Sequence, residues 1–215
     1  MVDISRINVE DPNTLKQVID RLTALEKQVK AIPDSLPPEK GVAQVSRQGY
    51  MSKEQVVALN NATTALATVT TGLAKIGKGC RVYMSGTMNF TSGTPTAFGF
   101  GLERWDDANF HDPSVNSNRI TIPVGWGGRY NVGCAVTWGG GGSGARIVQL
   151  RLNGATVIDQ MTLDGQTSSG PSFPPFETPW PLVAGDYVEV IGNQTAPGAT
   201  RTGQAEFWVT KLDYS

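Results

Sequence analysis

The segment WDDANFHD, residues 105–112, contains the side chains best suited to chemistry, because it places three carboxylates and a histidine in one predicted loop. Carboxylates this close together can bind Ca²⁺ through hard oxygen ligands, or can act as an acid pair in glycoside cleavage. The spacing of Asp106, Asp107 and Asp112 supports neither chemistry, so ordinary loop carboxylates are the simpler interpretation. Calcium binding by this loop stays an open alternative.

His111, in the same segment, is the only histidine of the chain. A single histidine excludes zinc sites that need several histidines, and any Ser-His-Asp arrangement would depend on this one loop residue. We therefore interpret His111 as a solvated loop side chain.

Two glycine-rich segments approach the spacing of nucleotide-binding loops but lack their context. GGGGSG, Gly139–Gly144, precedes the strand-like RIVQLRL instead of opening a helix. GLAKIGKG, Gly72–Gly79, has Gly79 where a phosphate-binding loop needs a metal-binding Ser or Thr, and no strand precedes it. We predict no cofactor, no catalytic residues and a protein that is not an enzyme.

The composition favours an all-β body. The chain of 215 residues has 25 Gly and 13 Pro beside 39% hydrophobic residues, which is too much turn chemistry for a helical bundle and too much core for disorder. The net charge of -1, without basic clusters, gives no sign of a nucleic-acid partner. The start MVDISRINVEDP lacks the features of a secretory signal, and no window is apolar enough to span a bilayer, so we expect a protein made in a cytosol.

Residues 13–32 predict a short coiled coil. Apolar residues alternate at spacings of three and four, Asp11 and Pro12 punctuate its start, and Pro33 stops it. The predicted interface positions are Leu15, Val18, Leu22, Leu25, Val29 and Ile32. Leucine at the first core position with β-branched residues at the second favours three or more strands over two. A single amphipathic helix that packs on its own domain stays an alternative.

The next segments predict a linker and a neck. Residues 33–48 are rich in proline and suit a semi-rigid spacer. Residues 49–79 contain a second helical pattern with Ser52 as its N-cap. Its thin apolar stripe consists of Val56, Leu59, Thr63, Leu66, Val69 and Leu73. Such a helix has little reason to form unless partners bury it, so we interpret it as a second stalk element.

From Cys80 onward, short alternating runs separated by glycines predict an antiparallel jelly-roll sandwich. Candidate strands cover residues 81–89, 96–102, 119–122, 128–138, 146–153, 156–163, 187–193 and 204–214. Asn153-Gly154 is a strong two-residue hairpin signal. The two cysteines, Cys80 and Cys134, suit small buried hydrophobic side chains, with a disulfide between them as the minority alternative.

Residues 80–215 resemble the jelly-roll head shared by tumour necrosis factor and the complement q-subcomponent. The matching motifs are Thr121, Pro123, Gly128 and Tyr130; Leu152, Asn153 and Gly154; Leu182, Gly185, Asp186 and Val188; and Phe207 and Leu212. The resemblance implies a head that associates in threes through its strands, with Tyr130, Val132 and Phe207 as interface candidates. Because Gly125–Gly128 and the long loops depart from the family pattern, no ligand is carried over.

The segment GYMSKEQVVAL resembles a unit found between stalk and head in fibre proteins of tailed bacteriophages, through Gly49, Tyr50, Met51, Ser52 and Leu59. Together with the coil and the head, it implies a homotrimeric virion fibre or decoration protein. Its arm, residues 1–12, would bind a major capsid or tail protein, and its head would adsorb to the host surface. The sequence leaves open whether the fibre stands on head or tail.

A secreted or cell-surface lectin-like module that binds glycans is the alternative from another class. Its binding loops would use Trp105, Asp106, Asp107, Asp112 and Trp126, because aromatic rings stack on sugars. A glycan depolymerase is the third alternative.

Overall fold

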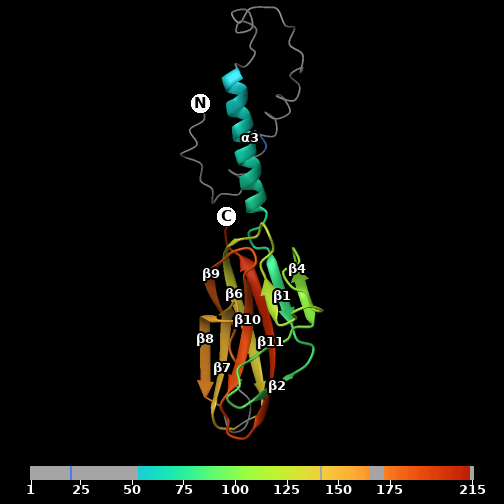
Figure 1. Cartoon of the computed structure of the whole chain (residues 1–215), viewed down its shortest axis with the longest axis vertical. Helices are drawn as coiled ribbons and strands as arrows, with labels where there is room; N and C mark the ends of the chain where they lie inside the picture. Colours follow the sequence, from blue (N-terminus) through green and yellow to red (C-terminus); the bar gives the residue numbers. More distant parts are fainter. Residues whose placement is uncertain (1–19, 21–52, 141, 165–171, 214–215) are drawn as a thin grey trace, which may run out of the picture. The chain divides into compact units, whose positions relative to one another are not determined.

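The computed structural model describes residue 20 and residues 53–140, 142–164 and 172–213 (Figure 1). By its internal contacts the chain divides into two units, Met1–Val69 and Thr70–Ser215. The predicted arm, coil and linker, residues 1–12, 13–32 and 33–48, lie outside the described residues, except that Asp20 is helical and exposed. The six coil positions therefore keep the status of sequence-based predictions.

The helix α3, Lys53–Leu73, lies in the segment for which the second helical pattern is predicted. Its sequence KEQVVALNNATTALATVTTGL carries charge only at its first two residues. Thr63, Thr64 and Thr68 each donate a hydroxyl hydrogen bond to the carbonyl four residues earlier, so these side chains are turned back onto the helix. No helix among the described residues is long and apolar enough to cross a membrane.

The head consists of two antiparallel sheets (Figure 1). Its strands are β1 Gly79–Tyr83, β2 Met88–Thr91, β3 Thr96–Ala97, β4 Leu102–Asp106, β5 Arg119–Thr121, β6 Gly128–Gly139, β7 Ala145–Leu152, β8 Thr156–Asp164, β9 Phe176–Leu182, β10 Tyr187–Gln194 and β11 Thr200–Lys211. The first sheet has the order β4-β1-β11-β6-β9, with β2 paired to β11, and the second has the order β3-β10-β7-β8, with β5 paired to β10. From β6 onward the chain crosses between the sheets repeatedly, which makes the predicted jelly roll.

The core lies between the two sheets and follows the alternation of the strands. In β6 the side chains of Tyr130, Val132, Cys134, Val136 and Trp138 are at most 1% exposed. Each such large apolar side chain contributes roughly 1.5–3 kcal/mol when fully buried. The predicted one-sided strand 128–138 is thus confirmed as a central strand of the core.

Glycines make room for aromatic rings inside this core. Phe90 packs at 4.7 Å from Phe98 and at 4.8 Å from Trp138, measured between ring centroids. A Cβ atom on Gly192 would come within 2.7 Å of the Phe90 ring. Since no real Cβ contact is that short, β10 needs glycine at this position.

The hairpin between β7 and β8 turns at Asn153 and Gly154, whose φ angles are 50° and 73°. Two successive positive φ angles define the turn that Asn-Gly favours, so this prediction is confirmed. The Asn153 side chain accepts a hydrogen bond from Tyr187 N and donates one to Asp186, which ties the turn to the start of β10.

Cys80 and Cys134 are both free and fully buried. Burial raises the pKa of each thiol well above its usual range, so both stay neutral. The prediction of two small buried hydrophobic side chains is confirmed, and the disulfide alternative is wrong.

Several predicted elements differ from the structure. The predicted strand 81–89 is divided into β1 and β2, the predicted strand 96–102 contains β3 and only the first residue of β4, and the predicted strand 204–214 begins earlier, as β11. The run SSGPSFPPFETPWP, interpreted as extended polyproline, contains β9 except for its last residue. Pro179 and Pro181 fit in this strand because β9 is the edge of its sheet, where an N–H that faces away from β6 has no partner to lose.

Candidate functional site

The outer face of the first sheet carries a row of stacked aromatic and guanidinium groups. Pairing of β1 with β4 and β11 places Arg81 opposite both Trp105 and Trp208. The Arg81 guanidinium carbon lies 5.8 Å from the centroid of the Trp105 ring and 4.9 Å from that of Trp208. A guanidinium between two indole rings gains cation–π attraction on both sides.

A second row lies beside the first, further along the same strands. Tyr83 lies opposite Glu206, and the Arg104 guanidinium carbon lies 4.6 Å from the centroid of the Tyr83 ring. Glu206 accepts a hydrogen bond of 2.8 Å from Arg81 Nε and another from Arg104 Nε. One carboxylate thus joins the two rows.

The pKa of Glu206 reflects this pairing. Burial alone would raise the pKa of its carboxyl, but the hydrogen bonds and positive charges of Arg81 and Arg104 outweigh burial and lower it. The hydrogen bond to Glu206 raises the pKa of Arg104 in turn. Glu206 is therefore a carboxylate over the whole neutral range.

The network reaches the next two strands through Glu177. Its carboxylate accepts hydrogen bonds from Trp208 Nε1 at 3.2 Å and from Asn131 Nδ2 at 2.7 Å. Gly133 lies beneath, and a Cβ atom there would come within 2.7 Å of the Trp208 ring and of Glu177 Cβ. Glycine at this position lets the indole lie directly on β6.

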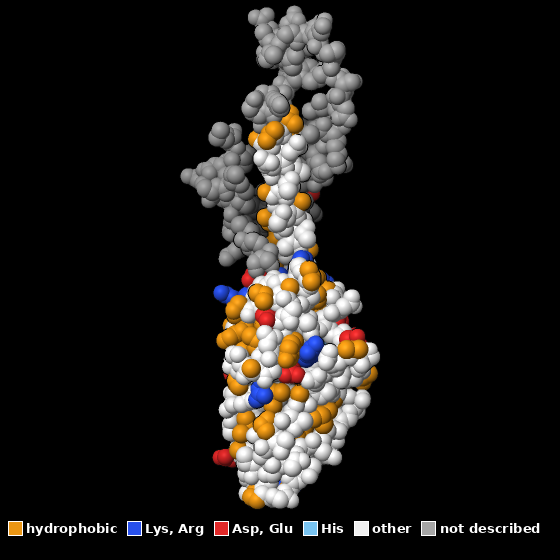
Figure 2. All heavy atoms as spheres, in the orientation of Figure 1, with side chains coloured by type: hydrophobic (Ala, Val, Ile, Leu, Met, Phe, Trp, Pro, Cys, Tyr) orange, Lys and Arg blue, Asp and Glu red, His pale blue; other side chains and the backbone are white. Residues whose placement is uncertain are grey.

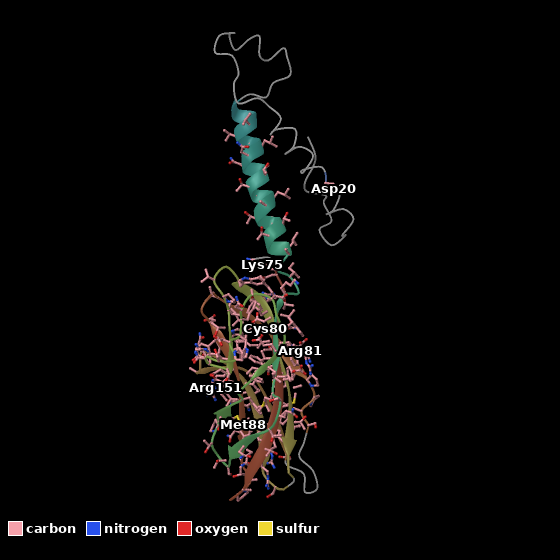
Figure 3. All side chains as sticks on the ribbon, turned by 90° about the vertical axis from the view of Figure 1, so that its right-hand side faces the viewer. Asp20, Lys75, Cys80, Arg81, Met88 and Arg151 are labelled. Atoms are coloured by element: carbon pink, nitrogen blue, oxygen red, sulfur yellow. The ribbon has the colours of Figure 1, made fainter. Side chains whose placement is uncertain are left out.

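The outer face also contains a shallow cavity of about 200 Å³ beside Tyr83, Arg104, Thr137 and Gln204. Its walls combine an aromatic ring, a guanidinium and uncharged polar groups. Figure 3 marks Arg81 on one side of the head and Arg151, from the second sheet, on the other. The outer face thus carries polar and aromatic side chains that are held in place by one another, and such a surface can bind another macromolecule or a glycan.

Sequence reasoning missed most of this surface. Of its members, only Trp105 is a predicted site residue, and the structure finds it 39% exposed, beside Arg81. The signal for the others was the outward half of the alternation in GCRVY and QAEFW. Alternation alone does not say which strands are neighbours, so Arg81 and Glu206 could not be joined without the register.

The three predicted carboxylates all have hydrogen-bond partners within the protein, and Trp105 and Asp106 belong to β4 and not to the predicted loop. Asp106 accepts hydrogen bonds from the backbone of Ala108, Phe110 and His111, at 2.9–3.1 Å. Asp107 bonds Gly79 N and Lys78 Nζ, and Asp112 bonds Ser114 through both its backbone and its hydroxyl. Within the described part of the chain, no three metal-ligating side chains gather at one point.

His111 differs from its prediction as a solvated side chain. Its side chain is 0% exposed, with Nδ1 at 2.9 Å from Glu103 Oε1 and Nε2 at 3.3 Å from the Ser117 carbonyl oxygen. Burial is possible because both ring nitrogens find partners. A cavity of about 200 Å³ lies next to it, between Asp112, Asn116 and Arg119.

Trp126, the other aromatic of the predicted binding loops, is half-buried. Its ring lies 5.3 Å from that of Phe110, and Lys75 Nζ lies 5.1 Å from its centroid. The structure therefore gives Trp126 a packing role and does not bring it together with Trp105, the second aromatic of the predicted loops.

The head positions predicted for the trimer interface need correction. Tyr130, Val132 and Phe207 are each 0% exposed within a single chain, because they point between the two sheets. A buried core side chain has no surface left for another copy. The outward neighbours of these residues on β6 and β11, such as Asn131 and Trp208, lie on the outer face instead.

Comparisons with known proteins found similar structures but no similar sequence families. No family model matches the chain, and no curated protein matches it. The globular domain of zebrafish complement 1qA protein aligns with a TM-score of 0.45 and 15% identity, over 63% of this chain and 97% of that chain. PRD1 vertex protein P5 gives 0.46 and 12%, over 63% and 73%, and Eiger TNF from S. frugiperda gives 0.44 and 12%, over 63% and 93%.

Proposed function

We propose that this chain is a homotrimeric structural protein of a bacteriophage virion, without enzymatic activity. In this proposal the arm of residues 1–12 anchors it to a capsid or tail protein, the coil and α3 form a stalk, and the jelly-roll head adsorbs to the host at the virion surface. The order of stalk and head, and the segment GYMSKEQVVAL with its likeness to phage fibres, support the virion part of this proposal.

The composition of α3 is the main observation in support of a trimer. After Glu54 the helix has no charged residue, and threonine and valine, which are mediocre helix formers, recur along it. Val56, Leu59 and Leu66 follow each other at three and seven positions, which is heptad spacing. A lone helix of this kind gains too little to be stable in water, whereas three copies around one axis would bury the apolar stripe.

The outer face of the first sheet supports the same assembly. It presents the indole rings of Trp105 and Trp208 together with paired charges, and aromatic and arginine side chains are the groups that dominate stable protein interfaces. Joining three heads would also raise the effective concentration of the three helices for one another.

Sedimentation of the full chain tests the trimer. At micromolar concentration we expect one species of about three times the 23.0 kDa of a single chain. Leu59→Asp combined with Leu66→Asp should weaken that species and reduce the helical circular dichroism signal. Asn61→Asp with Ala65→Asp, on exposed positions of the same helix, is the matched control. A wild-type chain that sediments as a monomer would refute the trimer.

Imaging of labelled particles tests the virion part. We expect the label on the particle surface, and we expect a chain without residues 1–12 to be absent from purified particles while still forming trimers. Attachment of the truncated chain at the wild-type level would contradict the anchoring role.

Glycan binding is the second candidate function, favoured by the exposed indole of Trp105 beside a guanidinium. A glycan array with the purified protein, with and without a chelator, tests it; this candidate requires that Trp105 lies outside the contact between the heads. Binding that Trp105→Ala abolishes would support this function, and binding lost with the chelator would add a calcium site.

A further inference from the structure

Arg146 is a charged side chain inside the core of the head. It is 0% exposed, and the alternation of β7 points it to the same side as Val148 and Leu150. A charge removed from water is costly unless hydrogen bonds and an opposite charge compensate it. Arg146 therefore requires hydrogen-bond acceptors and an opposite charge nearby.

Only one of its three guanidinium nitrogens is engaged. Nη1 donates to the carbonyl oxygens of Gly144 at 3.3 Å and Ala145 at 3.4 Å. Nε and Nη2 are buried without a hydrogen-bond partner. These two nitrogens share one edge of the planar group, and this edge is the fork that binds the two oxygens of a carboxylate or phosphate side by side.

The surroundings of this fork supply more donors. The Trp138 ring centroid lies 6.0 Å from the Arg146 guanidinium carbon, and its Nε1 is buried without a partner. Arg201 Nε is buried without a partner as well. Burial first, and the positive charge of Arg201 second, lower the pKa of Arg146. None of the ion pairs among the described residues includes either arginine.

Gly140, Gly142 and Gly144, which no nucleotide-binding motif explains, lie close to these groups. Gly140 and Gly142 have φ angles of 78° and 122°. A Cβ atom on Gly142 would come within 2.5 Å of Arg201 Nη2, and one on Gly144 within 2.7 Å of Ala196 N. Only glycine allows the backbone to approach Arg201 and Ala196 this closely.

We propose that Arg146, Arg201 and Trp138 form a binding site for a small inorganic oxyanion, sulfate or phosphate, beside the backbone of Gly142 and Gly144. The anion fills the open fork of Arg146 and balances two positive charges that have no carboxylate partner. Because Arg146 is 0% exposed, the occupant is a free small ion, since a sugar or a side chain of another protein would be too large. This site is independent of the trimer and of the virion assignment.

Equilibrium dialysis of the full chain with radiolabelled sulfate, at constant ionic strength set with NaCl, tests the site. We expect saturable binding of about one anion per chain. Arg146→Met should abolish it, and Arg129→Met, which removes an exposed arginine on β6, should leave it unchanged. Wild-type protein that binds no sulfate saturably would overturn the proposal, and so would equal binding by folded Arg146→Met.

Two milder variants keep the test decisive if Arg146→Met fails to fold. Trp138→Phe removes one donor but keeps a ring in the core, and Arg201→Met removes one charge from a half-exposed position. Each should weaken sulfate binding by about tenfold or more, the usual effect of losing a hydrogen bond to a charged group. Unchanged affinity in both variants would contradict the site.

Competition by unlabelled phosphate tests the chemistry of the donors. The three side chains offer donors and no acceptor, so sulfate should bind at least as tightly as phosphate, whose remaining proton at neutral pH finds no acceptor. A clear preference for phosphate would contradict this set of residues. Thermal unfolding in sulfate is informative only as a difference between wild type and variants. Both anions stabilise folded proteins in general, because they are excluded from the protein surface.

Discussion

Glu206 shows how one residue can organise a surface. Its carboxylate bonds two arginines that come from β1 and β4, and Arg81 is 125 positions away in the chain. The Glu206 side chain is 20% exposed, whereas that of Arg104 is 52% exposed, so solvent screens the second pair more than the first. The contribution of the network to stability therefore depends mainly on Glu206 and Arg81.

The lowered pKa of Glu206 predicts a pH dependence with a definite sign. A carboxyl whose pKa is lower in the folded state stabilises the fold above its unfolded pKa of about 4.5, and this contribution is lost as pH falls below that value through the folded pKa. Glu206→Gln should destabilise the head by about 1 kcal/mol at pH 7, a typical value for a partly exposed pair. The difference should shrink below pH 4.

Urea unfolding of wild type and Glu206→Gln at pH 7 and pH 3.5 measures this difference. Asp164→Asn, at an exposed position at the end of β8, serves as the control, and its effect should be small at both values. A penalty for Glu206→Gln that stays constant between the two pH values would show that the carboxylate charge does not contribute.

Strands and turns were predicted from the sequence where their signal is local. The alternation of Tyr130, Val132 and Cys134 predicts a buried face, and Asn153-Gly154 predicts a hairpin, because both follow from backbone geometry over a few residues. The strand β9 escaped prediction because its prolines are compatible with a strand only at a sheet edge. Edge position is a property of the whole fold.

The functional residues were harder to predict than the fold, because their position also depends on which strands and sheets are neighbours. Alternation shows that Tyr130 and Val132 share a face, but it does not say whether that face meets the second sheet or another copy of the chain. The structure shows that it meets the second sheet. Likewise, Asp106 and Asp112 bond the backbone of their own segment, because close spacing along the chain favours local turns as readily as ligand binding.

Contact between β6 and its neighbours predicts a sharp effect of Gly133→Ala. The added methyl group would come within 2.7 Å of the Trp208 ring and Glu177 Cβ, so the indole must leave its position. We expect a loss of about 1–3 kcal/mol in the free energy of unfolding, as for overpacked sites. Gly86→Ala, where a Cβ meets nothing within 4 Å, should cost far less.

Tryptophan fluorescence during urea unfolding measures both variants. In Gly133→Ala the emission should also shift in the folded state, because Trp208 loses its hydrogen bond to Glu177 when the ring moves. Equal stability of the two variants would mean that Trp208 can lie elsewhere on the sheet at no cost.

At the scale of the whole molecule, the head and the helix α3 differ in what stabilises them. The head has its own buried core between two sheets, including the fully buried side chains of Phe207, Trp138 and Arg146. The helix has few charges and a thin apolar stripe, so in our proposal its stability depends on the other two copies. Figure 2 shows hydrophobic and charged side chains scattered over the visible face of the head, among backbone and side chains of other types.

This difference predicts how changes in the coil act on the assembly. Leu22→Asp together with Leu25→Asp places charges at two predicted core positions of residues 13–32, where three copies would meet. Because the heads associate through their own surface in our proposal, the double variant should lose helical circular dichroism signal yet keep the trimeric mass in light scattering.

The matched control is Lys16→Asp with Lys27→Asp, which changes charges at positions outside the predicted seam. It should keep both the helical signal and the trimeric mass. If the double leucine variant instead scatters light as a monomer, the coil drives assembly and the outer face of the head does not. Such a result would place the trimer contact in residues 13–32 and not on the sheet of β1, β6 and β11. The outer face of that sheet would then be free to bind a host receptor.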